Sequence, residues 1–186
     1  MFRFLRKLLF KLLFVALVLF VGYRLYTDNT SFETVNYDVS IAALPSAFEG
    51  YTIVQVSDLH GHQFGDNNEK LMAEIDLAQP DIIVITGDIA EDDAEEKAVA
   101  LALCGRLSQL APTFYVAGNH EWAMESPRDF FAAIEQTGVK VLENESVTLV
   151  QGEQSITLAG IGDPNGPYDQ IAPEDFIAST GDGTCI

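Results

Sequence analysis

The sequence predicts an α/β domain built on a largely parallel sheet and preceded by an apolar helix. Short β-branched segments recur along the chain, and helical patterns with one apolar face separate them. Strands that alternate with helices in this way form parallel sheets. Each segment is also nearly continuous in apolar residues, which is typical of a strand covered on both faces. The three clearest segments are residues 51–56, 81–86 and 113–117.

The first 26 residues form a separate apolar segment, in which residues 12–21 are an unbroken apolar run. Basic residues flank this run: Arg3, Arg6, Lys7 and Lys11 precede it, and Arg24 follows it. We predict a signal anchor, that is, a transmembrane helix over residues 1–26. A cleaved signal peptide is the alternative, but residues 23–26 offer no small-x-small cleavage site. The positive-inside rule then predicts a single-pass protein of the cell membrane, with its large domain outside the cytoplasm.

Residues 27–49 are predicted as a linker and first strand region, and residues 50–186 as the main domain. Period-2 alternation favours a strand at 34–41. Asn67 or Asn68 can cap a helix that ends before Pro80. Asp92 or Asp93 can cap a longer helix that ends before Pro112. Its predicted inward residues are Val99, Ala102, Leu103, Leu107 and Leu110.

The last predicted elements are a helix, a short strand and a hairpin. Ser126-Pro127 is typical of a helix start, and Gly138 suits the end of that helix. Residues 139–142 favour a further strand. Residues 146–150 and 155–160 flank Gln151-Gly152 and predict a hairpin.

Charge and cysteine content argue against a nucleic-acid-binding protein and against a disulfide-stabilised one. The chain has 186 residues and a net charge of -18, and 28 acidic residues face only five basic ones after Arg24. Such a domain repels nucleic acid, so no nucleic-acid partner is expected. Cys104 lies in an apolar helical pattern and is predicted to be a buried thiol. Two distant cysteines, Cys104 and Cys185, predict no disulfide framework.

Polar residues follow the three strands. Asp58 and His60 follow the first strand, Asp88 the second, and Asn119 and His120 the third. The carboxyl ends of parallel strands share one edge of a sheet, so these side chains are expected to converge. Oxygen ligands mixed with imidazole suit manganese, iron or zinc. The sequence therefore predicts a metal site, against the alternative of an unrelated α/β domain with chance motifs.

Three motifs carry a family resemblance. Ser57-Asp58-Leu59-His60, Gly87-Asp88 and Gly118-Asn119-His120-Glu121 resemble the first three signatures of the calcineurin-like metallophosphoesterases. The resemblance covers about residues 35–163. It is strongest to the membrane-anchored bacterial branch of UDP-diacylglucosamine hydrolases and related phosphodiesterases. It implies a four-layer αββα sandwich that holds two divalent metal ions.

The resemblance also implies roles for six residues. Asp58 and His60 would bind the first metal, Asp88 would bridge both metals, and Asn119 would bind the second. His120 would sit beside the scissile phosphate as general acid or transition-state stabiliser. Glu91, three residues after Asp88, has a longer side chain than the aspartate that relatives often place there to orient this histidine. His62 matches no ligand position and is predicted to be a loop histidine.

The implied reaction is hydrolysis of a phosphoester or phosphodiester by a metal-activated water, with a phosphorylated small molecule or lipid as substrate. The family carries further signatures, a lone histidine and then Gly-His-x-His, but the chain contains only His60, His62 and His120. The resemblance therefore implies a carboxyl-terminally truncated chain, an incomplete sandwich, and weak or no activity. The alternative is a non-catalytic, membrane-tethered module that binds metal or phosphate.

Overall fold

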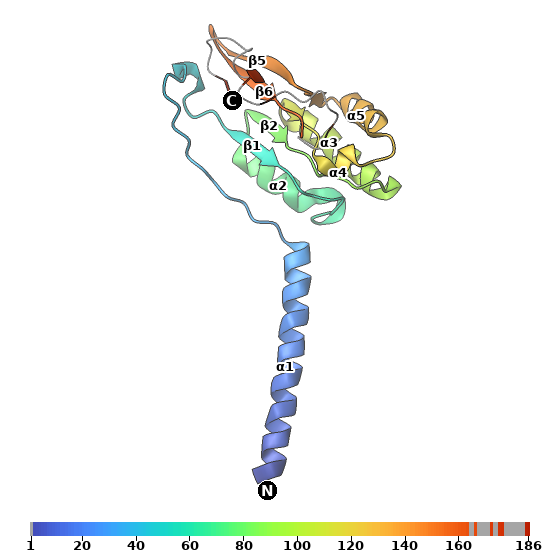
Figure 1. Cartoon of the computed structure of the whole chain (residues 1–186). Coiled ribbons are helices and arrows are strands. Elements are labelled where there is room, and N and C mark those ends of the chain that lie inside the picture. The colour runs from blue at the N-terminus through green and yellow to red at the C-terminus, as the bar shows by residue number, and fades with distance from the viewer. Residues whose placement is uncertain (1, 164–165, 167–171, 173–174, 177–184) are drawn as a thin grey trace. The chain divides into compact units, whose positions relative to one another are not determined.

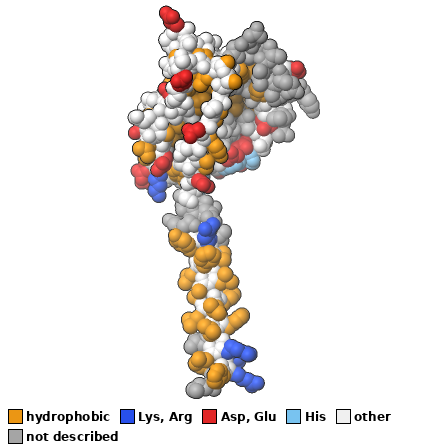
Figure 2. All heavy atoms as spheres, turned by 90° about the vertical axis from the view of Figure 1, so that its left-hand side faces the viewer, with side chains coloured by type: hydrophobic (Ala, Val, Ile, Leu, Met, Phe, Trp, Pro, Cys, Tyr) orange, Lys and Arg blue, Asp and Glu red, His pale blue; other side chains and the backbone are white. Residues whose placement is uncertain are grey.

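The computed structural model describes residues 2–163, 166, 172, 175–176 and 185–186. The chain divides into two units, Met1–Asn36 and Tyr37–Ile186. The first unit contains one long helix, α1 (Phe2–Thr30). Its described side chains are all exposed, and Figure 2 shows hydrophobic side chains along it and Lys and Arg near its amino end.

The amino-terminal helix is present as predicted and extends a few residues beyond position 26. Within the described part of the chain, however, no helix combines the length and the apolarity needed to cross a membrane. The predicted transmembrane helix over residues 1–26 is therefore not confirmed.

The segment after α1 is irregular. Residues 31–41 contain neither helix nor strand, so the strand predicted over 34–41 is wrong. Tyr37 and Val39 of this stretch are 81% and 74% exposed. Period-2 alternation alone does not make a strand, because the backbone also needs a neighbour to hydrogen-bond. A short 3-10 helix, η1 (Ser46–Phe48), follows and buries Phe48 in the core.

A four-stranded parallel sheet forms the centre of the second unit (Figure 1). The strands are β1 (Ile53–Val56), β2 (Ile82–Ile85), β3 (Thr113–Tyr115) and β4 (Lys140–Val141). Their order in the sheet is the order in the chain, and each neighbouring pair is parallel. Every strand therefore ends at the same edge, which the predicted convergence of polar residues requires.

Helices connect the strands. They are η2 (Asp66–Asn68), α2 (Glu69–Ala78), α3 (Ala94–Leu110), α4 (Asn119–Trp122) and α5 (Pro127–Gln136). Because crossovers between parallel strands are right-handed and the strand order never reverses, α2, α3 and α5 belong on one face of the sheet. The four-residue α4 was not predicted.

Helix α3 matches its predicted cap but not its whole predicted face. The Asp93 side chain accepts hydrogen bonds from the backbone N–H groups of Glu95 and Glu96. Ala102, predicted to point inward, is exposed, whereas Ala100 and Cys104 are buried. An alanine carries too little apolar area to decide which way a helix turns, so the larger Leu103 and Leu107 set the buried face.

The other face of the sheet carries the predicted hairpin. Its antiparallel strands are β5 (Glu145–Gln151) and β6 (Gln154–Gly160). One core cluster joins side chains of the parallel sheet to those of the hairpin. Its buried members are Phe48, Ile82, Phe114, Leu142, Leu149, Ile156 and Leu158. The described residues thus form a mixed α/β fold with a parallel sheet, as predicted, with helices and a hairpin on opposite faces.

Candidate metal centre

The loops after β1 and β2 are joined through their backbones. The N–H of Asp58 donates to the Gly87 carbonyl at 3.2 Å, and the N–H of His60 donates to the Asp88 carbonyl at 2.9 Å. Gly61 N–H donates to the Ile89 carbonyl at 2.8 Å. These bonds continue the pairing of the two strands beyond the sheet and fix the residues that follow it.

Three of the predicted metal ligands have left-handed backbones. The φ angles of Asp58, His60 and Asp88 are 57°, 46° and 55°. Residues other than glycine rarely adopt this region, and those that do cluster at functional sites. The sharp turns aim successive side chains at the strand-end edge. This strain was not visible in the sequence.

The loops after β2 and β3 meet at two glycines. A Cβ on Gly87 would lie 2.3 Å from the backbone nitrogen of Gly118, and a Cβ on Gly118 would lie 2.3 Å from Asp88 Oδ1. Only residues without a side chain allow this approach. The two glycines therefore let one loop pack directly against the other.

The structure brings Asp58, His60 and Asp88 together. One potential ligand atom from each lies within 4.8 Å of the other two. Two carboxylates and an imidazole are donors that suit a borderline divalent ion, so these residues fit the metal that the sequence predicts. Asn119 is exposed and begins α4, directly before His120. The metal-binding roles of all four residues stay predictions.

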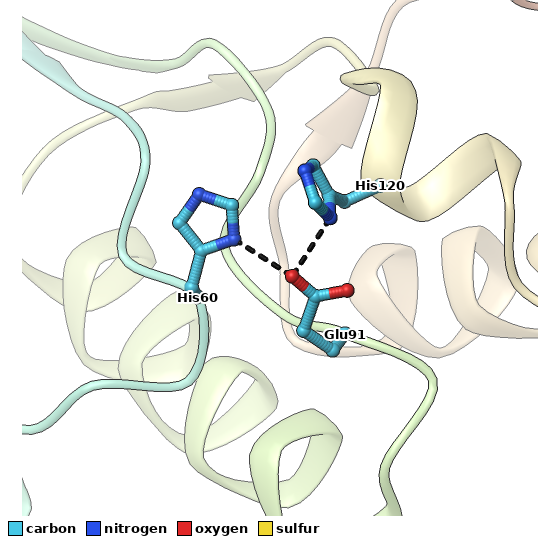
Figure 3. A group of neighbouring side chains, drawn as sticks. All are labelled: His60, Glu91 and His120. Atoms are coloured by element: carbon cyan, nitrogen blue, oxygen red, sulfur yellow. Dashed lines mark hydrogen bonds and ion pairs between the residues drawn. The ribbon is translucent and has the colours of Figure 1, made fainter.

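The carboxylate of Glu91 lies between two imidazoles (Figure 3). Its Oε1 is 2.7 Å from His120 Nδ1 and 3.0 Å from His60 Nδ1. The two rings meet edge to face with centroids 4.6 Å apart. Because a carboxylate accepts hydrogen bonds, both Nδ1 atoms carry a proton, which leaves each Nε2 free to face another group.

These contacts shift two pKa values in opposite directions. The hydrogen bond from His120, and then that from His60, lowers the pKa of the Glu91 carboxyl. The hydrogen bond to Glu91 raises the pKa of His120. Both shifts favour the charged forms of the pair. The longer side chain of Glu91 thus reaches the histidine that it was predicted to orient, although the orienting role itself stays a prediction.

His60, Glu91 and His120 form a second group whose ligand atoms lie within 4.8 Å of one another. His60 belongs to both groups, so the two groups are neighbouring parts of one site. His62, predicted to be a loop histidine, is exposed and its ring lies beside Phe64.

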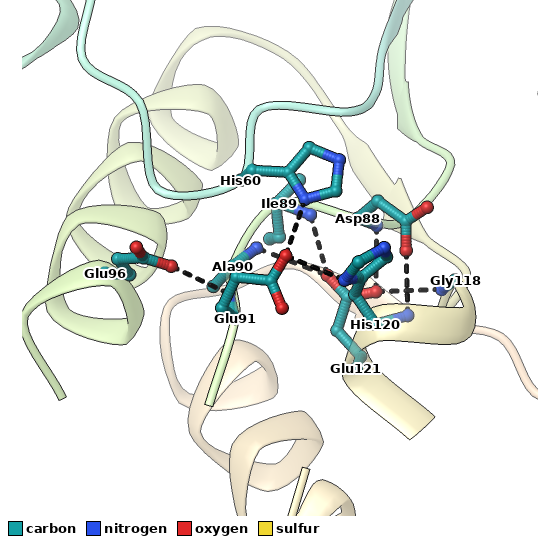
Figure 4. Close-up of polar contacts among 9 residues, drawn as sticks. All are labelled: His60, Asp88, Ile89, Ala90, Glu91, Glu96, Gly118, His120 and Glu121. Atoms are coloured by element: carbon teal, nitrogen blue, oxygen red, sulfur yellow. Dashed lines mark hydrogen bonds and ion pairs between the residues drawn. The ribbon is translucent and has the colours of Figure 1, made fainter. Parts of the chain in front are cut away.

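Glu121 is the site residue whose role sequence reasoning missed. It is the last residue of the Gly118-Asn119-His120-Glu121 motif, and its side chain is fully buried below the histidines (Figure 4). Its carboxylate accepts backbone hydrogen bonds from both the β2 and the β3 loops. The signal that could have found it is a glutamate three residues after Gly118, the spacing of a helix capping box.

Comparisons with known proteins now decide the family. Residues 51–182 match the model of the calcineurin-like phosphoesterases, which is well over half of the chain. The chain belongs to this family. The prediction from the three motifs is therefore confirmed at that level, and membership indicates metal-dependent phosphoester hydrolysis for the family. The narrower bacterial branch stays a prediction.

Relatives match over only part of their own length. A Bos taurus protein named "Transmembrane protein with metallophosphoesterase domain" is 29% identical over 134 residues, 68% of this chain and 30% of the relative. A Campylobacter jejuni protein named an uncharacterized metallophosphoesterase is 26% identical over 159 residues, 84% of this chain and 41% of the relative. This chain thus spans less than half of either relative's length.

One solved structure is also similar. It is the phosphopantetheinyl hydrolase of Mycobacterium tuberculosis, at 19% identity and a TM-score of 0.42. The similarity covers 69% of this chain and 50% of that one. At this level of similarity it carries no argument about the site.

Proposed function

We propose that this chain carries a metal-dependent phosphoesterase site that hydrolyses a phosphoester or phosphodiester. The observation that carries the proposal is the carboxylate of Glu91, which contacts His60 and His120 at once. This contact joins His60, which lies in one group with Asp58 and Asp88, to His120, which would face the substrate. Family membership supports the same reaction class.

Four residues would hold the divalent ions: Asp58, His60, Asp88 and Asn119. Bound there, the ions would supply charge neutralisation for the phosphate and activation of the attacking water. Manganese, iron or zinc fits the mixed oxygen and nitrogen donors. One imidazole and three oxygen donors are a sparse ligand set for two ions, so we expect weak binding and slow turnover by this chain.

His120 would act on the leaving group. With its Nδ1 held by Glu91, its Nε2 is the atom available to a phosphate oxygen. The raised pKa of His120 keeps this ring protonated over a wider pH range, as a proton donor requires. Glu91 would thus fix the orientation of the ring and stabilise its charge without touching the substrate.

We also propose that the substrate is a phosphorylated small molecule or a lipid-linked or nucleotide-sugar compound presented at a membrane. Support comes from α1, whose apolar side chains are exposed beside basic residues near its amino end. Basic residues beside an apolar segment are attracted to anionic lipid headgroups. The name of the bovine relative, a transmembrane protein, points the same way.

The test is hydrolysis of bis(p-nitrophenyl) phosphate by the 186-residue protein over a range of Mn²⁺ concentrations. Slow, Mn²⁺-dependent turnover is expected. His120→Gln should reduce it by about 100-fold or more, the usual range for a lost proton donor. His62→Gln is the matched control, because it makes the same change at the exposed loop histidine.

Equal losses in His120→Gln and His62→Gln would contradict the role of His120. Mn²⁺ binding without turnover in the wild type would instead favour the non-catalytic binding module. Failure of the wild type to bind Mn²⁺ at all would contradict the proposed site.

A further inference from the structure

Glu121 is a fully buried acid at the third position of the short helix α4. Its side chain has 0% exposure. The carboxylate accepts hydrogen bonds from four backbone N–H groups (Figure 4). Oε2 accepts from Asp88 at 2.8 Å and Gly118 at 2.9 Å, and Oε1 accepts from Ile89 at 2.7 Å and Ala90 at 3.4 Å.

These donors explain how a charge can be buried there. Burying a carboxylate is costly unless hydrogen bonds replace the water that it loses. Four amide donors converge on two oxygen atoms, and charge-assisted hydrogen bonds to carboxylates are stronger than neutral ones. Glu121 is therefore a structural acceptor for the backbone around it.

The four donors belong to the two loops that carry predicted ligands. Asp88, Ile89 and Ala90 follow β2, whereas Gly118 directly precedes Asn119 after β3. A further hydrogen bond joins the same two loops: the N–H of His120 donates to Asp88 Oδ1 at 3.0 Å. A shift of either loop would therefore move Asp88 relative to Asn119.

We propose that Glu121 is a positioning residue that sets the separation of Asp88 and Asn119 and so determines how tightly the site binds a divalent cation. This inference rests on the proposed function, in which those two side chains face the ions. Residues that hold metal ligands from behind typically change metal affinity 10- to 100-fold when they are replaced.

The first experiment reads the loops without any metal. In Glu121→Gln, one carboxylate oxygen becomes an NH₂ donor, so two of the four N–H groups lose their acceptor in either orientation of the amide. Hydrogen exchange is measured by NMR in EDTA-treated protein. The exchange rate should rise about tenfold at the N–H of Asp88 or Ile89, depending on which oxygen is replaced, and also at the N–H of His120, which is bonded to Asp88. Glu135→Gln, the same change at an exposed position of α5, is the matched control.

The second experiment measures Mn²⁺ affinity by electron paramagnetic resonance of the free ion. The affinity is normalised to the fraction of folded protein, which circular dichroism gives. Glu121→Gln should weaken affinity about tenfold or more, and Glu135→Gln should leave it unchanged. If Glu121→Gln folds poorly, Glu121→Asp gives the same comparison, since its shorter side chain cannot reach both loops.

The outcomes distinguish the positioning role of Glu121 from the proposed function. Unchanged exchange at the His120 N–H would overturn the role of Glu121, as would a uniform acceleration at all amides, which indicates lost global stability alone. Unchanged Mn²⁺ affinity in a folded variant would overturn it too. A wild type that binds no Mn²⁺ would contradict the proposed function, and the metal-free exchange would then still decide whether Glu121 positions the loops.

Discussion

At the scale of single residues, Glu91 shows what a motif position can and cannot predict. Its place three residues after Asp88 predicted a contact with His120, and the Oε1 of Glu91 does reach His120 Nδ1 at 2.7 Å. The second contact, with His60, was not predicted. It depends on the left-handed turn at His60, which a sequence without a glycine at that position does not indicate.

The Glu91–His120 pair has a definite pH dependence. The pKa of Glu91 is lowered and that of His120 is raised, each by the hydrogen bond to the other. The pair therefore stabilises the fold most between about pH 4.3 and 6.5, the ordinary pKa values of the two groups. Its contribution is lost as pH rises through the raised pKa of His120 or falls through the lowered pKa of Glu91.

We predict that Glu91→Gln lowers the pKa of His120, because the neutral amide no longer stabilises the positive ring. The measurement is an NMR titration of the imidazole protons in EDTA-treated protein. Glu135→Gln serves as the control and should leave this pKa unchanged. A pKa of His120 that stays the same in Glu91→Gln would show that the contact is absent in solution.

At the scale of elements, strands and long helices were predictable, but the shortest elements were not. β2 is a run of four β-branched residues between polar ends, and this pattern predicts a strand. Helix α4 has only four residues, and Glu121 holds it in place through contacts with a different loop. Such an element depends on tertiary contacts that no local pattern records.

The amino-terminal cap of α3 is the clearest case in which a single residue fixes where a helix begins. Asp93 Oδ1 accepts from the N–H groups of Glu95 at 2.8 Å and Glu96 at 3.1 Å. Asp93→Ala should lower the free energy of unfolding by about 1 kcal/mol, within the range of lost amino-terminal caps. Urea denaturation measures this change. Glu74→Ala, at an exposed position of α2, is the comparison and should change stability by less than about 0.5 kcal/mol; equal effects would contradict the capping role.

At the scale of the whole second unit, the core between the parallel sheet and the hairpin holds two distant parts of the chain together. Phe48, Ile82 and Phe114 meet Ile156 and Leu158 in this cluster. Residues 146–150 and 155–160, which flank Gln151-Gly152, predicted the hairpin itself. Which layer it covers could not be predicted, because that depends on where the chain returns after β4.

Replacement of one hairpin residue tests this packing. Ile156 is 3% exposed, and Ile156→Ala should cost about 2–5 kcal/mol of stability through lost apolar contact and the cavity left behind. Val150, on the same hairpin, is 65% exposed, and Val150→Ala should change stability by less than about 0.5 kcal/mol. Similar values for the two variants, measured by urea denaturation, would show that the hairpin does not pack as described.

The most direct test of the central claim is anomalous X-ray scattering from crystals of the protein soaked in Mn²⁺. We expect a manganese peak within coordination distance of Asp58, His60 and Asp88, and loss of that peak in Asp88→Asn. Peaks confined to other acidic side chains, or an unchanged peak in Asp88→Asn, would contradict the claim that the strand ends form a metal centre.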